Sequence, residues 1–259
     1  MKHIVLFSGG VGSWAAAKRV AERHGTDDLI LLFTDTLIED EDTYRFLEEA
    51  AANVGGEFVR IADGRTPFEV FKDVRFLGNS RIDPCSKYLK RDLADKWIKE
   101  HFQPGECIMY IGIDWSEIDR YERLAPRKLP YIYKAPLCHP PFVTRAEMHA
   151  WAEREGLRKQ RLYEIGMSHA NCGGGCVKAG QGHWAKLYKA MPERFAWWEM
   201  KEQEIRDMLG DVSMLKQQVN GESAPLALSE LRKRLEEDDT QVDMFDIGGC
   251  ACMVEWGES

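Results

Sequence analysis

The sequence predicts an α/β protein: a doubly wound parallel sheet with a C-terminal helical lobe that carries cysteines. Short apolar runs alternate with segments of helical spacing through the first part of the chain, which is the order of elements in a doubly wound sheet. The run at 107–113 is apolar almost without a break, as is typical of a parallel strand buried on both faces. After about residue 140 the pattern becomes helical and glycine-rich, so we divide the chain into an α/β core at 1–140 and a lobe at 141–259.

Each element of the core has its own local signal. Continuous apolar runs predict strands, and regularly spaced apolar residues predict the helices between them. Glycines follow the first two helices, because glycine readily adopts the backbone conformation that ends a helix. The expected strands cover residues 4–7, 29–33, 57–61 and 107–113, and the expected helices cover 14–24, about 44–54 and 86–102.

The lobe begins with a helix at 144–155. Thr144 and Glu147 have the spacing of a capping box at its start, and Gly156 follows its end. The segment 166–183 is rich in glycine and carries two cysteines. Further helices are expected at about 183–209 and 225–238.

Charge and composition exclude some classes of protein. The formal net charge of −8 argues against nonspecific coating of nucleic acid, but it allows a local basic groove or recruitment by a partner protein. No apolar stretch reaches the 18 or so residues needed to span a membrane, and the N-terminal apolar run is too short for a signal peptide. We therefore expect a cytoplasmic protein, in which the seven cysteines serve metal binding or redox chemistry rather than structural disulfides.

The most informative motif is the glycine loop, Ser8-Gly9-Gly10-Val11-Gly12-Ser13, which lies between the first strand and the first helix. Glycines let backbone N–H groups approach a phosphate closely, and the helix dipole favours negative charge at the helix N-terminus. The loop has no Lys before its last Ser, so it is not a Gly-x-x-x-x-Gly-Lys-Ser/Thr loop, nor is it Gly-x-Gly-x-x-Gly. A plain glycine turn is the alternative interpretation.

This loop resembles the Ser-Gly-Gly-x-Asp-Ser loop of the PP-loop ATP pyrophosphatases, the adenine-nucleotide alpha-hydrolase-like superfamily. The resemblance implies that the loop binds the phosphates of ATP and that residues 1–140 are a PP-loop nucleotide-binding core. Gly12 stands where the family usually has Asp. That difference removes any metal or water role of the Asp, but it leaves the binding of phosphate by the backbone intact.

Further segments resemble one branch of the superfamily, which includes phosphoadenylyl-sulfate reductases and DNA phosphorothioation sulfurtransferases. They occur in the same order as in that branch and, with the glycine loop, span about residues 3–180. The segments are Phe33-Thr34-Asp35-Thr36 with Glu39, Pro84-Cys85-Ser86-Lys87-Tyr88-Leu89-Lys90, Gly112-Ile113-Asp114 with Glu117 and Arg120, Pro136-Leu137, Tyr163-Glu164-Ile165-Gly166, and Cys172-Gly173-Gly174-Gly175-Cys176-Val177-Lys178.

The resemblance implies roles for individual residues. The residues expected to bind the nucleotide are Ser8, Gly9, Gly10, Gly12, Ser13, Thr34, Asp35, Thr36 and Gly112. The residues expected to take part in catalysis are Ser13, Asp35, Asp114 and Arg120. Mg²⁺ would neutralise charge on the triphosphate.

Five cysteines lie in glycine-, proline- or serine-rich surroundings, where thiolates can bind soft metals or clusters. Members of the resembled branch often hold a [4Fe–4S] cluster with one upstream Cys and a downstream group. The expected ligands here are Cys85, Cys172, Cys176 and Cys252, with Cys250 as the rival for the fourth position. Zinc would accept the same ligands, and redox thiols without metal are the third alternative. Cys107 and Cys138 are expected to be core residues, and His169 and His183 to be surface or capping residues.

Lys87, Lys90 and Arg91 have the i, i+3, i+4 spacing of one helix face. They would bind a phosphate or a nucleic-acid backbone of the substrate, or else form a solvated face with Asp92 and Asp95 as partners. The pair Trp197-Trp198 is more typical of core packing than of a platform for stacked bases.

Three functions remain open. The first is an ATP-dependent sulfurtransferase that adenylates its substrate, releases pyrophosphate and inserts sulfur into nucleic acid, a DNA backbone phosphate or a tRNA base, with a cysteine desulfurase or other subunits as partners. The second is a phosphoadenylyl-sulfate or adenylyl-sulfate reductase that uses a tail cysteine. The third is a non-catalytic subunit that senses a nucleotide or cluster. The chain could act as an oligomer in any of them.

Overall fold

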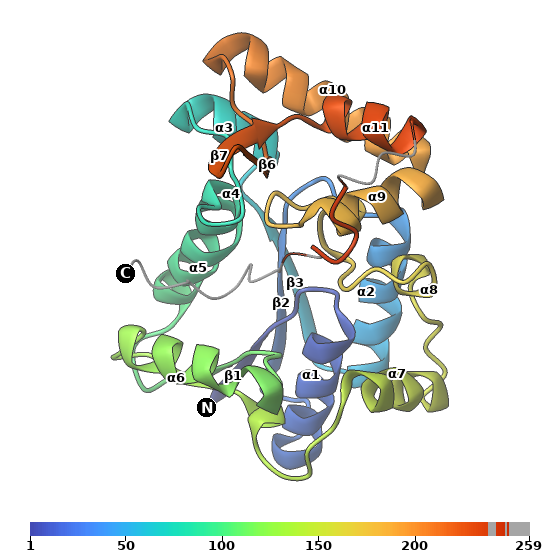
Figure 1. The fold of residues 1–259 in the computed structure, drawn as a ribbon. Coiled ribbons are helices and arrows are strands. Elements are labelled where there is room, and N and C mark those ends of the chain that lie inside the picture. The colour runs from blue at the N-terminus through green and yellow to red at the C-terminus, as the bar shows by residue number, and fades with distance from the viewer. Residues whose placement is uncertain (238–241, 247, 249–259) are drawn as a thin grey trace.

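A five-stranded sheet forms the centre of the computed structural model, which describes residues 1–237, 242–246 and 248 (Figure 1). The strands are β1 (Lys2–Leu6), β2 (Leu29–Asp35), β3 (Glu57–Ala62), β4 (Cys107–Tyr110) and β5 (Ile132–Lys134). Their order is β3-β2-β1-β4-β5, and every neighbouring pair is parallel. The predicted fold class, a doubly wound parallel sheet, is therefore confirmed. The short strand β5 was not predicted.

Helices cover both faces of the sheet (Figure 1). Neighbouring residues of a strand point to opposite faces, so Val5 and Leu31 pack with α1 (Val11–His24), α2 (Glu41–Val54) and α7 (Arg145–Arg154). Ile4 and Leu32 pack on the other face with α5 (Leu93–His101) and α6 (Ile118–Arg127). All seven residues of β2 are buried, which explains why this strand is apolar without alternation.

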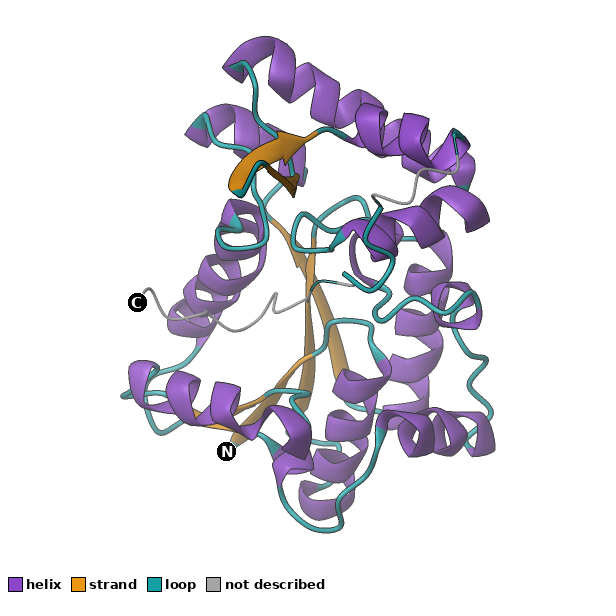
Figure 2. Ribbon diagram, in the orientation of Figure 1, coloured by secondary structure: helices purple, strands orange, loops and turns teal. Residues whose placement is uncertain are grey.

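A third apolar cluster lies beyond the carboxyl edge of the sheet and holds the lobe together. Its elements include α3 (Pro67–Val74), α8 (Arg161–Glu164), α9 (Gln181–Ala190), α10 (Pro192–Leu209) and α11 (Leu228–Glu236). An antiparallel hairpin, β6 (Leu215–Val219) and β7 (Glu222–Leu226), packs there as well (Figure 2). The lobe is mainly helical, as expected, and this hairpin was not predicted. The turn between β6 and β7 is Asn220-Gly221, with φ of 53° and 83°. A two-residue turn of this composition predicts a hairpin.

The helix expected at 86–102 is interrupted. It consists of α4 (Pro84–Ser86), a π-helical segment η1 (Lys87–Asp92) and α5. A π-helix has more residues per turn than an α-helix, so the residue at i+3 no longer shares a face with the residues at i and i+4. The remaining short helical turns are η2 (Trp115–Glu117), η3 (Pro136–Cys138) and η4 (Asn171–Gly174).

Packing crosses the boundary that we expect at residue 140. Phe68 and Phe71 of α3 belong to the cluster of the lobe, whereas Met148 and Ala152 of α7 pack on the sheet. The division into 1–140 and 141–259 therefore stays a proposal. None of the described helices combines the length and apolar character that crossing a membrane requires.

Candidate functional site

The candidate site lies where the winding of the sheet reverses. The chain builds β1, β2 and β3 outward in one direction and then returns to place β4 on the other side of β1. Ligands of doubly wound sheets bind beyond the carboxyl ends of the strands at this switch point. A cavity of about 160 Å³, here named the loop cavity, opens there between the segments that follow β1 and β4. The predicted residues that line it are Ser8, Gly10, Gly12, Ser13, Lys90, Gly112, Asp114 and Arg120.

The glycine loop presents the start of α1 to this cavity. Gly9 adopts a φ of 80°, and Thr43 and Leu47 of α2 pack directly against it. Gly10 is the N-cap of α1 and makes no side-chain cap, so N–H groups of the first turn lack the usual side-chain acceptor. The Ser13 hydroxyl donates to the Gly10 carbonyl at 2.8 Å. This geometry suits a bound anion.

The segment that follows β4, Gly112–Arg120, contacts the glycine loop through the backbone of Gly112. A Cβ at Gly12 would lie 2.9 Å from the Gly112 carbonyl oxygen, and a Cβ at Gly112 would lie 2.7 Å from the Ser13 nitrogen. Neither position therefore has room for a side chain. The close approach of Gly112 explains why Gly12 stands where the resembled family has Asp.

Charged side chains of the same segment line the loop cavity. Asp114 caps η2, and its Oδ1 accepts from the Ser116 N–H at 2.9 Å and from the Ser116 hydroxyl at 2.5 Å. Arg120 pairs with Glu117. The site thus offers two carboxylates and a guanidinium within one cavity.

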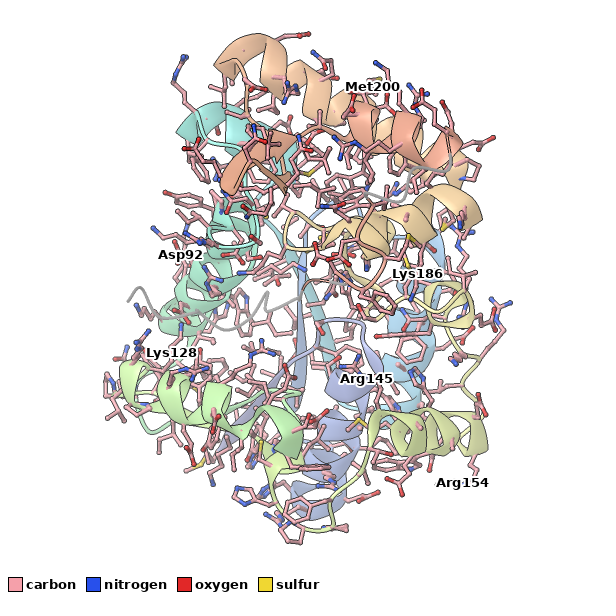
Figure 3. All side chains as sticks on the ribbon, viewed as in Figure 1. Asp92, Lys128, Arg145, Arg154, Lys186 and Met200 are labelled. Carbon is pink, nitrogen blue, oxygen red and sulfur yellow. The ribbon has the colours of Figure 1, made fainter. Side chains whose placement is uncertain are left out.

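The structure adds residues that sequence reasoning missed. Arg145, Tyr163 and Asn171 also line the loop cavity, and the Arg145 Nη1 donates to the Ser168 carbonyl at 2.7 Å (Figure 3). Arg145 is the first residue of α7. Because acidic residues are favoured in the first turn of a helix, a cation at this position is unfavourable for the helix itself, and it was the local signal that could have drawn attention to Arg145.

The contacts of Asp35 lie outside the loop cavity. It is fully buried, and its carboxylate accepts from the Tyr44 hydroxyl at 2.8 Å and from the Arg60 Nε at 2.9 Å. Burial and the neighbouring Asp35 carboxylate raise the pKa of Tyr44. Thr34, Asp35 and Thr36 are not among the described residues that line the loop cavity. Their expected contact with the nucleotide stays a prediction.

The basic set is split by the π-helical turn. Lys87 is exposed, whereas Lys90 and Arg91 are 4% and 9% exposed. Lys90 Nζ lies 3.5 Å from Glu39 Oε1. The expectation that all three share one helix face was wrong, because Lys90 lines the loop cavity whereas Lys87 and Arg91 line another cavity. The alternative of a solvated face with Asp92 and Asp95 as partners was also wrong, because Lys90 and Arg91 are buried.

The cysteine loop, residues 172–176, is filled by the protein's own side chains. Cys172, Gly173 and Gly174 have positive φ of 54°, 62° and 85°. A Cβ at Gly173 would overlap the guanidinium of Arg194, and one at Gly175 would overlap the indole ring of Trp198. The Cys172 N–H donates to the Glu39 carboxylate. The glycines of this loop therefore follow from packing, without reference to a metal.

Three of the predicted ligand cysteines lie in or against the apolar cluster of the lobe. Cys172 and Cys176 are buried in the cluster of the lobe, and Cys85 packs against it. Among the residues that the structure describes, no three His, Cys, Asp or Glu side chains are grouped so that they could hold a metal ion. The described donors alone therefore do not fit a cluster. Cys250 and Cys252 lie outside the described residues.

Several side chains are core residues. Cys107 and Cys138 are 1% and 4% exposed, as predicted, and burial raises the pKa of Cys138 to about 11. Trp198 is 1% exposed, which confirms core packing for it. His183, expected at the surface or as a capping residue, is buried, and its Nε2 lies 2.7 Å from the carbonyl oxygen of Gly174, the last residue of η4. Burial lowers the pKa of His183.

No protein-family model matches the chain, but a protein of similar sequence is known. An uncharacterized protein of Methanocaldococcus jannaschii is 24% identical over 213 residues, which are 80% of this chain, and the chain spans 43% of the length of that relative.

Two solved structures are similar to the chain. A phosphoadenylyl-sulfate reductase from Candida auris, in a phosphate complex, has a TM-score of 0.46 and 17% identity over 65% of this chain and 80% of that chain. An NH3-dependent NAD synthetase from Campylobacter jejuni, in complex with the nitrate ion, has a TM-score of 0.41 and 12% identity over 80% of this chain and 83% of that chain. The fold class of the protein itself follows from the order and parallel pairing of its five strands.

Proposed function

We propose that the chain is an ATP-using PP-loop enzyme that transfers sulfur to a nucleic acid. One observation carries the proposal: the glycine loop and the segment Gly112–Arg120 line a single cavity at the switch point of the sheet. In this reaction an oxygen of the acceptor attacks the α-phosphorus of ATP, and the bond to pyrophosphate breaks. A sulfur nucleophile then displaces AMP from the adenylate.

The residues of the loop cavity suit the first step. Backbone N–H groups at the start of α1 would bind phosphate oxygens, while Lys90, Arg120 and Arg145, from three different segments of the chain, would supply positive charge. Charge placed in advance around the leaving pyrophosphate lowers the barrier. The cavity of about 160 Å³ is smaller than the roughly 300–1,000 Å³ of most small-molecule sites, so it would hold the phosphates and leave the adenosine outside it.

Mg²⁺ fits this donor set. Magnesium sites commonly use one or two carboxylates together with substrate phosphates, and Asp114 and Glu117 both line the loop cavity. These two residues would hold the ion, which would neutralise charge on the triphosphate. The backbone and the cationic side chains would orient the same phosphates.

The [4Fe–4S] cluster is a separate expectation, with zinc as its alternative. Its support is the resemblance together with the common apolar cluster that holds Cys85, Cys172 and Cys176. We derive no step through it, because the described donors do not form a metal-binding group. Iron per chain, counted after anaerobic purification of Cys172→Ala and Cys176→Ala, tests it, with Cys107→Ala as the control. Full iron retention in the first two variants would contradict a cluster.

The products test the reaction. Incubation with ATP, Mg²⁺ and candidate acceptors is expected to release AMP and pyrophosphate, whereas ADP and phosphate would contradict the proposal. Sulfite release from an adenylyl sulfate with a thiol reductant would favour the reductase instead. ATP binding with no turnover for any acceptor would favour a sensing subunit.

Gly10→Asp tests the site. A Cβ at Gly10 has 3.4 Å to its nearest neighbour, the Tyr163 hydroxyl, so the variant is expected to fold while its carboxylate repels phosphate. ATP affinity measured by calorimetry is expected to fall at least a hundredfold. Gly10→Ala is the matched control without the charge, and unchanged affinity in Gly10→Asp would remove the nucleotide site.

A further inference from the structure

A second cavity lies on the other side of η1. Lys90 lines the loop cavity, but its neighbour Arg91 lines a separate cavity of about 680 Å³, here named the Arg91 cavity. Segments far apart in the sequence form its walls, from α3 to η1, from α6 and from the lobe. Its charged lining residues are Arg81, Asp83, Lys87, Arg91, Arg127 and Lys178, five cations and one carboxylate.

Two of these cations are buried with too little negative charge. Arg91 and Lys178 are 9% and 4% exposed, and the Arg91 Nη1 and the Lys178 Nζ both lie 3.6 Å from the same oxygen, Asp83 Oδ2. Within the described structure, the Arg91 Nε and Nη1 and this Asp83 oxygen have no hydrogen-bond partner. Buried charges and unpaired buried donors are costly. An anion bound beside Arg91 and Lys178 would therefore stabilise these side chains.

The surroundings extend the positive charge outward. Lys87 and Arg127 are exposed at the rim of the Arg91 cavity. A neighbouring cavity of about 250 Å³ shares Arg91 and Arg127 and is also lined by Lys99, Arg123, Lys128 and one carboxylate, Asp95. Such a concentration of cations, in a chain of net charge −8, focuses the field on anions.

We propose that the Arg91 cavity is a second anion site, which binds a phosphate group between the Arg91 guanidinium and the Lys178 ammonium. The planar fork of arginine donates two parallel hydrogen bonds to a phosphate, and here two of its donors are unused. The phosphate comes either from the backbone of a nucleic acid or from a small phosphorylated molecule. The proposal goes beyond the proposed function, because it requires no nucleotide at the glycine loop.

The test measures binding of radiolabelled inorganic phosphate by equilibrium dialysis. Gly10→Asp serves as the background, so that the glycine loop does not contribute. Arg91→Met, which keeps an apolar stem, is expected to weaken phosphate binding at least tenfold, whereas Lys96→Met, an exposed lysine on α5, is expected to leave it unchanged. Unchanged affinity in Arg91→Met would overturn the proposal.

Asp83→Asn gives a change of opposite sign, which misfolding cannot mimic. Removing the carboxylate that competes for Arg91 and Lys178 is expected to raise phosphate affinity at least threefold. A fall in affinity in Asp83→Asn, with the fold intact by circular dichroism, would count against an anion site.

A fluorescein-labelled single-stranded 12-nucleotide DNA distinguishes the two sources. If the site takes a nucleic-acid backbone, the oligonucleotide binds at least a hundredfold more tightly than inorganic phosphate, with an affinity that falls steeply with salt. If it takes a small phosphorylated molecule, the oligonucleotide binds no more tightly than phosphate. Tight oligonucleotide binding that Arg91→Met does not weaken would refute the role of this cavity.

Discussion

The glycine loop at 8–13 and the cysteine loop at 172–176 are both rich in glycine, but they use it for opposite purposes. In the glycine loop, Gly12 makes room for the backbone of Gly112, and an open cavity remains beside it. In the cysteine loop, the space beside Gly173 and Gly175 is taken by Arg194 and Trp198.

The comparison shows that glycine content alone does not identify a ligand site. Glycine lacks a Cβ, so it permits close approach by a ligand, by another backbone or by a large side chain. Which of these approaches occurs depends on residues distant in the sequence. The glycine loop is a candidate site because its neighbours leave a cavity. The cysteine loop instead packs the lobe against α2.

Gly175→Ala is the strongest test of this difference. Its Cβ would overlap the buried indole ring of Trp198, and overpacking of this kind costs about 3 kcal/mol. Urea unfolding is expected to show that loss, while ATP affinity of the folded protein stays unchanged. Trp198→Leu in the same chain should recover part of the stability. A loss below about 0.5 kcal/mol would mean that the cysteine loop is not tightly packed.

Gly112→Ala acts on the other loop. Its Cβ would press on the backbone of Gly12 and Ser13, 2.7–2.8 Å away. We expect ATP affinity to fall ten- to a hundredfold, about 1.4–2.8 kcal/mol, as measured by calorimetry. Gly12→Asp is also expected to weaken binding although it restores the residue of the resembled family. Tighter binding in Gly12→Asp would contradict the steric explanation.

The two loops should also differ in their response to pH. Burial holds the pKa of His183 below its ordinary 6.5, so the unfolded chain takes up a proton first as the pH falls. The contribution of His183 to the free energy of unfolding is therefore full above pH 6.5 and is lost below it, by at most about 1.4 kcal/mol per pH unit for one proton. The glycine loop contains no titratable residue.

His183→Gln isolates this contribution. The amide can still donate to the Gly174 carbonyl but does not titrate, so denaturant unfolding at pH 7.5 and 5.5 is expected to show a smaller loss than in the unmodified protein. The comparison is necessary because burial also lowers the pKa of His3, His24 and His149. Equal losses in both proteins would assign the pH dependence to those histidines.

Gly10→Ala should have the smallest effect. Gly10 has extended backbone with φ of −89°, and its added Cβ would make only ordinary contact at 3.4 Å with the Tyr163 hydroxyl. The free energy of unfolding is expected to change by less than about 0.5 kcal/mol, and ATP affinity by less than tenfold. A large loss of stability would show that the loop is closed rather than open.

The sequence alone determined the elements whose signals are local. Apolar runs such as 29–33 predicted the strands, because a parallel strand buried on both faces must be apolar throughout. The glycine loop was predicted from its position between a strand and a helix. Asn220-Gly221 and Arg145 are signals of the same local kind, although the hairpin and this side chain of the cavity were not predicted.

Only the tertiary structure decided which distant residues meet. No local pattern indicates that Arg60 pairs with Asp35, that Trp198 covers Gly175, or that Lys90 and Arg91 line different cavities. Strand and helix propensities depend on neighbours within one or two turns, whereas burial and ion pairing depend on how whole elements pack. Local patterns therefore predicted four strands of the sheet and the glycine loop, and packing decided which polar groups around them are left for a ligand.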